Sequence, residues 1–424
     1  MEISGKKLIW LTFILFGSAF LQYQWKKTDI PQHLVGHPVK LREHFIPDTL
    51  AEELLQTLKQ LGKFTANKSA FKPSGLAEDY QANPALDGKH GKLFLVPDET
   101  NTFLTLADRL DVIYHFTKYG GVDGLKENFD LLMRRMQIFE NHDKNHHITK
   151  QLLSNQFLQE LKDSCPKNRQ LLDGFDQSIT IRLPGQMTPI SLDVPHFRGI
   201  INDYYPSWLL VVMAASGLYQ DEFIHQSQAK ITLHNWNNTK KGGNFAFFTK
   251  NEIKPLYVQP IPRNAVFFDG SKTMHATTIY KPKAHPPQLL INATNYLQFL
   301  ENDDWLLFSD ERPLQKYKTK DLHITFVYRA RCFESEKQKE QYRTLNKENM
   351  KPVDEVIKEL TQALSKQTGS STVDLEKLSK IDLAVKLVEN FVKYPLPTKA
   401  LIPFNYCIIP MLFPSVQAYF NHFC

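Results

Sequence analysis

Residues Gly242 to Pro282 read GGNFAFFTKNEIKPLYVQPIPRNAVFFDGSKTMHATTIYKP, and this stretch decides the expected fold. It alternates short β-branched and aromatic runs with segments that contain Gly, Pro or Asn, a pattern typical of strands divided by turns. We interpret it as a strand, a crossing loop, a second strand that ends at Asp269-Gly270, a short loop, and a third strand that opens with His275. Helical patterns do not separate these strands, which favours antiparallel pairing.

The same strand pattern extends in both directions, from about Ser178 to Phe333. Its runs are SITIRL, AKITLHNW, NFAFFT, NAVFFDG, HATTIYKP, LLINATNYLQF and LHITFVYRARCF. One long apolar segment, PSWLLVVMAASGL, interrupts them and is either a buried strand or a packed helix. Many short strands without alternating helices predict an antiparallel double sheet or jelly roll, here within an α+β fold because helices flank it.

Upstream, Gly185 to Gly199 read GQMTPISLDVPHFRG and place a carboxylate just after a strand. Together with the Gly-Gly-x-aromatic strand and the block that contains His275, this order resembles the double-stranded β-helix of iron(II)/2-oxoglutarate-dependent dioxygenases of the prolyl-4-hydroxylase type. The resemblance implies a dioxygenase-like core over residues 178–335. It also implies iron(II) and 2-oxoglutarate as cofactors, ascorbate as an optional addition, and hydroxylation of an unidentified small molecule or protein.

The resemblance maps two iron ligands onto this chain, the carboxylate onto Asp193 and the distal histidine onto His275. In the family two imidazoles and one carboxylate hold the metal and leave positions open for 2-oxoglutarate and oxygen. The proximal histidine would precede Asp193 by two residues, so that both side chains point into the barrel. Ser191 occupies that position, and His-x-Asp or His-x-Glu occurs nowhere in the 424 residues.

Three other histidines are open alternatives for the missing ligand. His196 follows the carboxylate by three residues, and His225 and His234 lie on or beside neighbouring strands. A serine hydroxyl binds ferrous iron weakly beside imidazole. Ser191 therefore also favours a second hypothesis, a catalytically inactive member that acts as a binding or scaffold protein.

The cosubstrate needs a cation in the barrel, preferably an arginine that binds a carboxylate with two hydrogen bonds. The family spacing from the distal histidine lands on His285, in the loop KPKAHPPQ. If this loop and the following strand are an insertion, the last barrel strand is LHITFVYRARCF, where Arg329 and Arg331 share one face. We expect one of them, preferably Arg329, to bind 2-oxoglutarate; the alternative is a structural ion pair, and Lys281 or Lys283 are weaker candidates.

Helical patterns flank the core. Residues 28–177 are expected to be a helical region, with helices in IPDTLAEELLQTLKQLGKF, NFDLLMRRMQIFEN and TKQLLSNQFLQELKDS, and an exposed histidine-rich loop ENHDKNHHI. Thr49 and Glu52 have the spacing of a capping box. Residues 336–424 form a second helical region, in which Gly369–Thr372 links to an amphipathic helix over Val373–Lys393.

The N-terminus carries an apolar run from Leu8 to Tyr23 between lysine pairs, so residues 1–27 are expected to be a signal anchor or a signal peptide. This predicts a single-pass type II membrane protein facing the ER or Golgi lumen; the alternative is secretion after cleavage. Three glycosylation sequons, at Asn67, Asn237 and Asn292, permit lumenal exposure. The four cysteines allow one or two disulfides of undetermined pairing.

Composition narrows the remaining function classes. With 42% hydrophobic and 23% charged residues, the chain is ordinary globular protein and not a disordered one. Its net charge of +6 is spread without a basic block, so no nucleic-acid partner is expected. The acidic run ENDD at Glu301–Asp304, together with the anchor, suggests a third hypothesis, a type II membrane glycosyltransferase. The strand-rich core argues against it, because that chemistry usually occurs on α/β folds.

Overall fold

The computed structural model describes residues 31–34, 36–66, 95–97, 103–105, 134–135, 137–142, 147–249, 255–290, 293–392 and 414–416. The expected signal anchor, two of the sequons, Cys407, Cys424 and most of the proline-rich C-terminal segment lie outside these residues. Within the described part of the chain, none of the helices combines the length and the apolar character that crossing a bilayer requires.

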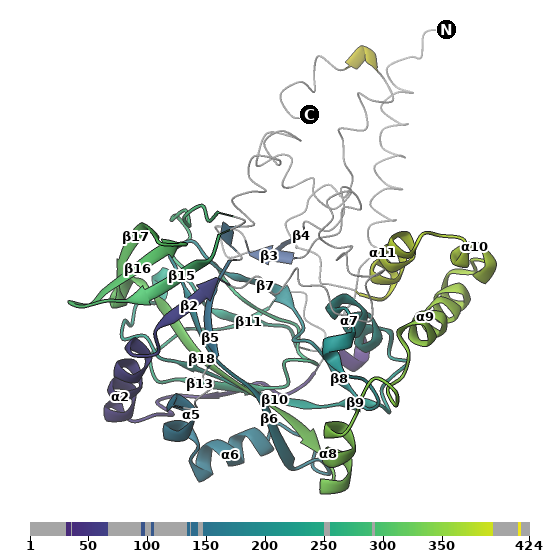
Figure 1. Ribbon diagram of the computed structural model, residues 1–424, viewed down its shortest axis with the longest axis horizontal. Coiled ribbons are helices and arrows are strands. Elements are labelled where there is room, and N and C mark those ends of the chain that lie inside the picture. Colours follow the sequence, from purple (N-terminus) through teal and green to yellow (C-terminus); the bar gives the residue numbers. More distant parts are fainter. Residues whose placement is uncertain are drawn as a thin grey trace, which may run out of the picture.

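Two antiparallel sheets form the centre of the molecule (Figure 1). The larger sheet has the strand order β1 (Lys40–Arg42), β13 (Ala265–Phe268), β10 (Gln226–Thr232), β18 (His323–Phe333), β6 (Leu171–Arg182), β5 (Phe139–His142), β2 (Lys63–Ala66), β15 (Asn295–Phe299), β16 (Asp304–Ser309) and β17 (Arg312–Lys318). The smaller sheet has the order β12 (Leu256–Val258), β11 (Phe245–Phe247), β14 (His275–Thr277), β7 (Thr188–Ser191), β3 (Leu95–Pro97) and β4 (Phe103–Thr105). A separate pair joins β8 (His196–Phe197) to β9 (Phe223–Ile224).

The chain passes repeatedly from one large sheet to the other. Strands β6, β10, β13 and β18 belong to the larger sheet, and β7, β11, β12 and β14 belong to the smaller one. Each adjacent pair within these sets is antiparallel, with β6 beside β18, β18 beside β10, and β7 beside β14. This alternation is the strand order of a double-stranded β-helix, so the expected jelly-roll core is confirmed.

The insertion expected before the last barrel strand is also present. Strands β15, β16 and β17 lie between β14 and β18 in the sequence and extend the larger sheet at its far end, where β15 pairs with β2. Strand β18 then returns to the centre of that sheet, between β6 and β10. His285 consequently lies in an exposed connecting loop and not on a barrel strand.

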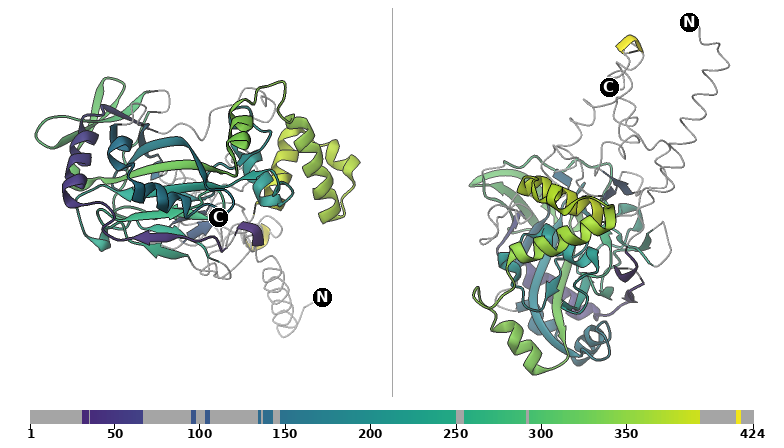
Figure 2. Two further views of the ribbon diagram at one scale, coloured as in Figure 1. Left: turned by 90° about the horizontal axis from the view of Figure 1, so that it is seen from below. Right: turned by 90° about the vertical axis from the view of Figure 1, so that its right-hand side faces the viewer.

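The two faces of the larger sheet differ in chemistry because residues alternate along each strand. On β18, Ile324, Phe326 and Tyr328 belong to an apolar core beneath three helices, α2 (Asp48–Lys59), α5 (His147–Leu152) and α6 (Asn155–Lys162). Figure 1 shows these helices grouped along one side of the sheet, and Figure 2 shows the same grouping from below. The helices contribute leucines and phenylalanine to this core, among them Leu54, Leu58, Phe157 and Leu161.

The opposite face of the larger sheet turns toward the smaller sheet and is more polar. Along β18 the alternate residues Thr325, Val327 and Arg329 lie on this face, and Arg182 and Lys230 line it from β6 and β10. Charged side chains inside a β-barrel need partners or a ligand. The barrel interior therefore holds charged side chains that a functional site could use.

A second apolar core lies beside the barrel, in a lobe of helices seen at the right of Figure 1. It is built around α7 (Ser207–Ser216), which lies against α11 (Lys380–Phe391); α9 (Val353–Thr368), α8 (Glu336–Arg343) and α10 (Thr372–Glu376) complete the C-terminal helices. Of the two structures considered for PSWLLVVMAASGL, the helix is the one formed. It ends at Gly217, whose φ of 72° is the left-handed conformation that glycine adopts at helix ends.

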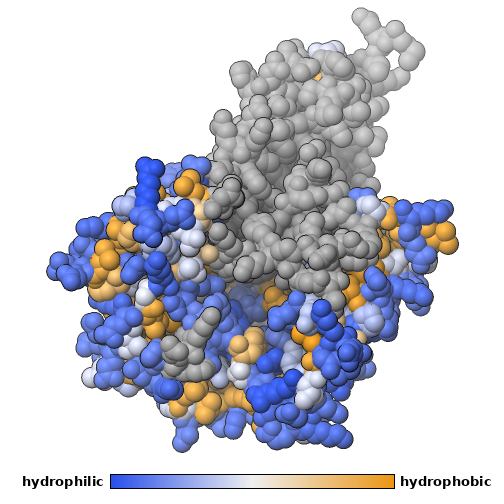
Figure 3. All heavy atoms as spheres, viewed as in Figure 1, coloured by the Kyte–Doolittle hydropathy of each residue, from blue (hydrophilic) through white to orange (hydrophobic). Residues whose placement is uncertain are grey.

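Short 3-10 helices occur at Gln32–Leu34, Asn202–Tyr204, Thr239–Lys241, Thr319–Asp321 and Pro414–Val416. The described part of the face in Figure 3 is mostly hydrophilic, and its apolar residues are scattered in small groups. This agrees with the solvated surface expected from the spread of charges.

The region 28–177 is less helical than its sequence suggests. Its described residues contain β1, β2, β3, β4 and β5, and barrel strand β6 begins at Leu171, seven residues before the expected boundary at Ser178. Phe139–His142, within a segment expected to be helical, pairs with Ile179 and Ile181 of β6. Tertiary pairing outweighs the local helical pattern there, because Phe139 reaches the apolar core.

Two local helix expectations are also wrong. Helix α2 exists, but its N-cap is Pro47, without a side-chain capping bond, so Thr49 and Glu52 form no capping box. The expected helix Val373–Lys393 is two helices, α10 and α11. The second starts anew at Ser379, whose side chain accepts a hydrogen bond from the Asp382 backbone N–H, a capping arrangement that stops one helix and begins the next.

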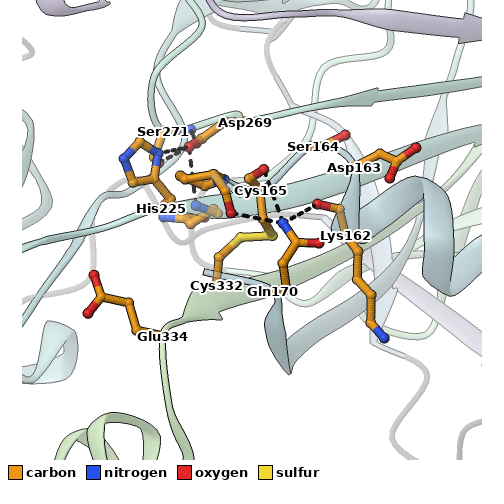
Figure 4. Close-up of a disulfide and its surroundings, with 12 residues drawn as sticks. Lys162, Asp163, Ser164, Cys165, Gln170, His225, Asp269, Ser271, Cys332 and Glu334 are labelled. Atoms are coloured by element: carbon orange, nitrogen blue, oxygen red, sulfur yellow. Dashed lines mark hydrogen bonds and ion pairs between the residues drawn. A yellow bond between two sulfur atoms is a disulfide. The ribbon is translucent and has the colours of Figure 1, made fainter. Parts of the chain in front are cut away.

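One disulfide links the helical layer to the barrel (Figure 4). Cys165, just after α6, is bonded to Cys332 on β18, with the two Cα atoms 5.9 Å apart. Beside it, the Gln170 side-chain amide donates to the backbone carbonyls of Lys162, Cys165 and Pro166 and holds the turn that carries Cys165. One of the bridges that the sequence allowed is thus assigned.

Candidate functional site

The two predicted metal ligands lie side by side where β7 ends and β14 begins, on neighbouring strands in the middle of the smaller sheet. Strands β7 and β14 are neighbours, and the Cα atom of Ser191 pairs with that of His275. Asp193 follows two residues after Ser191, and its backbone N–H donates to the Gly270 carbonyl at 2.9 Å. His275 Nε2 lies 3.7 Å from Asp193 Oδ1, while His275 Nδ1 contacts the Thr273 carbonyl at 2.8 Å.

A guanidinium group occupies the other side of the Asp193 carboxylate. Arg329 Nε donates to Asp193 Oδ2 at 3.2 Å, and Nη2 lies 3.5 Å from Oδ1, so the contact uses both carboxylate oxygens. Arg329 Nη1 also donates to Asp176 on β6, which in turn contacts His142 Nδ1 at 3.0 Å. A continuous chain of polar contacts therefore crosses the barrel from β5 to β14.

Burial and charge set the protonation of this chain. Burial alone would raise the pKa of Asp193, but Arg329, His275 and Lys230 outweigh it and hold the carboxyl well below its usual range. Burial and the positive charge of Lys230 together lower the pKa of His275 to about 4, against the opposing effect of Asp193. At neutral pH the site is thus a carboxylate paired with Arg329 beside a neutral imidazole.

The alternative histidines do not complete this site. His196 Nδ1 contacts the Gln226 amide at 3.0 Å, and its ring packs on Phe175. His225 contacts Asp269, and His234 contacts the Pro260 carbonyl. Each of the three has its own partner away from Asp193.

The donor set therefore does not fit the iron centre that the resemblance implies. That centre needs two imidazoles and a carboxylate, whereas the structure brings together one of each. Among the described residues, no group of three or more His, Cys, Asp or Glu side chains is placed to hold a metal ion. The carboxylate that remains is already bound by Arg329, so its charge is neutralised by the protein.

Both predicted cosubstrate arginines form ion pairs in this structure, which is the arrangement of the structural alternative. Arg329 is shared by Asp193 and Asp176. Arg331 Nη2 lies 2.8 Å from Asp173 Oδ2, and its guanidinium packs over the ring of Tyr342 on α8. The two arginines lie on one face, as expected, but both belong to ion pairs.

A cavity between the sheets carries cations that sequence reasoning missed. It has a volume of ≈ 40 Å³ and is lined by fourteen residues, among them Arg182, Lys230, Thr232, Thr277, His323 and Thr325. Arg182 donates to the Thr188 hydroxyl, and this is its hydrogen-bond partner within the described part of the chain. Burial lowers the pKa of Lys230 to about 7, an effect that Asp193 opposes.

Period-2 alternation could have indicated these residues. In SITIRL and AKITLHNW the apolar residues Ile181, Ala229 and Ile231 point to the helix-covered core. Arg182 and Lys230 must then point to the barrel interior. A single charged residue in a strand whose other residues are apolar or carry hydroxyls is the sequence feature that could have indicated such a cavity residue.

Two glycines explain why the site can close around these groups. A Cβ on Gly270 would lie 2.2 Å from both Asp193 Oδ2 and Gln228 Oε1, so only glycine lets these polar groups approach the β13–β14 loop. A Cβ on Gly243 would lie 2.7 Å from the His323 ring, and Gly243 has a φ of 76°. The Gly-Gly motif is thus a packing requirement of the cavity as well as a turn.

The acidic run Glu301–Asp304 is structural. Asn302 and Asp303 take left-handed backbone conformations at the turn between β15 and β16. Asp303 contacts Lys59, and Asp304 contacts Lys316 at 3.0 Å. These contacts tie together the far end of the larger sheet, and they give no support to the glycosyltransferase hypothesis.

A scan of the sequence against protein-family models finds no match, and a search of curated proteins finds none either. A search of solved structures returns a prolyl-4-hydroxylase from Pseudomonas putida, 11% identical, covering 71% of this chain and 96% of that one with a TM-score of 0.32. It also returns a prolyl hydroxylase from Trichoplax adhaerens in complex with a hypoxia inducible factor peptide, 12% identical, covering 77% and 96% with a TM-score of 0.33.

HygX from Streptomyces hygroscopicus, with nickel, 2-oxoglutarate and hygromycin B bound, is 8% identical and covers 73% of this chain and 85% of its own with a TM-score of 0.32. At such low identities and TM-scores these similarities decide nothing about activity. The fold assignment rests on the strand order of the two sheets.

Proposed function

We propose that this chain is a dioxygenase-like double-stranded β-helix protein in which an ion pair replaces the iron centre and the barrel binds a small organic anion. The observation that carries the first part is the contact of Arg329 with both oxygens of Asp193, beside His275. A guanidinium there supplies the positive charge that a metal would otherwise bring. The protein is then a binding protein and not an oxygenase.

The anion-binding part rests on the charges that line the cavity. Arg182 and Lys230 face it, and within the described part of the chain neither has a carboxylate at ion-pair distance. The charge of Glu140 acts on Arg182 and that of Asp193 acts on Lys230, and a bound anion would add a direct partner for both cations. The hydroxyls of Thr232, Thr277 and Thr325 add hydrogen-bond donors for the oxygens of a carboxylate.

A thermal-shift measurement tests the anion site. Propionate should raise the melting temperature of the wild-type protein, and Arg182→Met and Lys230→Met should each reduce that rise. Arg263→Met is the matched control, because Arg263 pairs with the exposed Asp48 outside the cavity and should leave the rise unchanged. An equal rise in all four proteins would mean that the anion binds elsewhere or not at all.

A second candidate function is an active iron(II)/2-oxoglutarate dioxygenase that uses ascorbate and hydroxylates a small molecule or protein. The observation in its favour is that Asp193 and His275, the two ligands implied by the resemblance, do lie together. The full chain should be assayed for conversion of 2-oxoglutarate to succinate with iron and ascorbate. Succinate formation with stoichiometric iron would overturn the ion-pair proposal.

Restoring the missing imidazole sharpens this test. Ser191 pairs with His275 across β7 and β14, so Ser191→His places a second imidazole at the expected position. Because Arg329 holds the carboxylate, Ser191→His alone should gain little iron affinity, and Ser191→His with Arg329→Met should gain more. If both variants bind iron no better than wild type, the mapping of the resemblance onto Asp193 and Ser191 is wrong.

For localisation we propose the secretory lumen, reached through an N-terminal anchor or a cleaved signal, with the membrane as the partner of the anchor and no nucleic-acid partner. The Cys165–Cys332 disulfide supports this proposal, because disulfides persist in oxidising compartments. Asn237 lies in a sequon and is exposed. Expression of the full chain in secretory cells should give a glycan that Asn237→Gln removes, and an unglycosylated wild type would count against lumenal delivery.

A further inference from the structure

We propose that Lys230 forms an imine with a short oxo acid bound in the barrel cavity, an inference that rests on the anion site proposed above. The carboxylate of such a ligand would pair with Arg182, and its carbonyl carbon would face the Lys230 amine. Nothing in the dioxygenase resemblance assigns a role to either residue.

The placement of Lys230 is that of a reactive amine and not of a structural cation. Its Nζ lies 4.9 Å from the ring centroid of Phe245 and 5.7 Å from that of Phe268, in an apolar part of the barrel. Within the described part of the chain it makes neither a hydrogen bond nor an ion pair. Asp193, whose negative charge acts on Lys230, is held by Arg329.

Its protonation supports the same role. Burial, together with smaller effects of Arg182 and Arg329, lowers the pKa of Lys230 to about 7 against the opposing effect of Asp193. A substantial fraction of the amine is therefore neutral at neutral pH and can act as a nucleophile. Desolvation beside other cations is the general way in which proteins activate a lysine for attack on carbonyl groups.

His323 adds a buried polar atom to the same cavity. Its Nε2 lies 3.1 Å from the Gly243 carbonyl, which only accepts hydrogen bonds, so Nε2 carries the ring hydrogen and Nδ1 presents a lone pair. His323 Nδ1 is buried and has no hydrogen-bond partner within the described residues. His323 lines the same cavity as Lys230, so this lone pair is an acceptor for a polar group of the bound ligand.

The chemistry balances without another reagent. The neutral Lys230 amine adds to the carbonyl carbon and forms a carbon–nitrogen bond, giving a carbinolamine. Loss of one water, made from the former carbonyl oxygen and the two amine hydrogens, leaves the carbon–nitrogen double bond of the imine. No electron donor or acceptor is consumed.

The size of the cavity selects the ligand. A single water needs about 10–15 Å³ on the measure by which this cavity has ≈ 40 Å³, so there is room for only a few heavy atoms. Short oxo acids such as pyruvate fit this limit better than the longer 2-oxoglutarate. The preference for a short ligand is thus a prediction, because a 2-oxoglutarate cosubstrate site would prefer the longer acid.

The test is reductive trapping of the full-length protein with pyruvate and sodium cyanoborohydride, followed by peptide mass spectrometry. We expect the peptide containing Lys230 to gain the mass of pyruvate minus one oxygen atom, faster than any peptide with an exposed lysine. Propionate, which has no carbonyl, should slow this labelling by competition, and 2-oxoglutarate should label more slowly than pyruvate.

Two variants test imine formation separately from anion binding. Lys230→Arg keeps the positive charge but cannot form an imine, so it should lose the adduct and keep the thermal shift with propionate. Lys272→Arg is the matched control, because Lys272 also lies over an aromatic ring, that of Phe223, but does not line the cavity.

The outcomes separate the two claims. A propionate shift without a Lys230 adduct overturns the imine and leaves the anion site standing. If neither appears, the anion site fails as well. Equal labelling of Lys230 and Lys272 means adventitious reaction of lysines that lie over aromatic rings, and it also overturns the proposal.

Discussion

Arg329 binds the carboxylate of Asp193, which the family resemblance assigns to the metal together with His275. In the barrel interior its guanidinium lies between Asp193 on the loop after β7 and Asp176 on β6. Both carboxylates are only about a fifth exposed, at 16% and 20%. Their charges are thus balanced within the protein, and loss of the cation would leave two poorly solvated carboxylates.

Replacing Arg329 tests this balance. We expect Arg329→Met to lower the free energy of unfolding by about 3 kcal/mol, because breaking a buried ion pair leaves its partners uncompensated. Urea denaturation measures the loss. The control is Arg263→Met, whose partner Asp48 is 77% exposed and whose loss should stay below about 1 kcal/mol.

A second substitution tests whether the uncompensated charge of Asp193 causes this loss of stability. Adding Asp193→Asn to Arg329→Met removes one of the stranded charges and should recover part of the lost stability. If Arg329→Met costs no more than Arg263→Met, or if the double variant recovers nothing, the ion pair is not what stabilises the centre of the barrel.

Lys230 should give the protein a distinct pH dependence. Its pKa is about 7 in the folded state, against 10.5 for an unperturbed lysine. Between these values the unfolded chain binds more protons than the folded one, so the free energy of unfolding rises as pH rises from about 7 toward 10.5. Below about 7 both states are protonated and the contribution of Lys230 no longer changes.

Urea denaturation at several pH values checks this. The rise should be smaller in Lys230→Met than in wild type, because methionine does not titrate. Lys316→Met, which removes an exposed lysine paired with Asp304, should keep the wild-type slope. A Lys230→Met protein with the full slope would show that another group controls this range.

At the scale of elements, β18 organises both the site and the stability of the fold. Its alternate residues face the helix-covered core and the barrel interior, and it pairs with β6 on one side and β10 on the other. The Cys165–Cys332 bond attaches this strand to the turn after α6 across a sequence separation of 167 residues. Closing so long a loop restricts the unfolded chain strongly.

Reduction of this disulfide should therefore destabilise the protein. We expect dithiothreitol to lower the free energy of unfolding by about 2–4 kcal/mol, the usual range for a native disulfide. The double variant Cys165→Ala/Cys332→Ala should show a comparable loss without reductant and no further loss with it. A wild-type protein indifferent to reductant would mean that this bond adds no stability.

At the scale of the whole molecule, the barrel and the C-terminal helices share one apolar core. Helix α7 lies between β8 and β9 in sequence, and its residues Leu209, Val212 and Met213 are buried in one apolar core with α9 and α11. The helices after the barrel thus cover an apolar element that belongs to it. A contiguous apolar surface of this kind causes aggregation when it is exposed.

Truncation tests this dependence. A chain that ends at residue 335 lacks α8 to α11 and should aggregate or bind hydrophobic dye, while a chain that ends at residue 392 should stay monomeric on size-exclusion chromatography. A monodisperse, dye-negative chain ending at 335 would show instead that the barrel is an independent domain with the expected boundary.

Local sequence determined the fold class. Short alternating runs from SITIRL to LHITFVYRARCF become the strands of a double-stranded β-helix, because period-2 patterns bury one face of each strand whatever the partner is. That Asp193 and His275 lie near each other was implied by the family resemblance and not by these runs. The helical pattern around Phe139 failed, because pairing with β6 buries that side chain more fully than a helix would.

Tertiary structure alone decided what occupies the site. Arg329 lies 136 residues after Asp193 in the sequence, and only the pairing of β18 with β6 and β10 brings its guanidinium to that carboxylate. The same pairing places Lys230 and Arg182 at one cavity. The sequence identified side chains that can ionise, but charge compensation depends on distances of a few ångströms across the barrel, and those distances exist only after the sheets have closed.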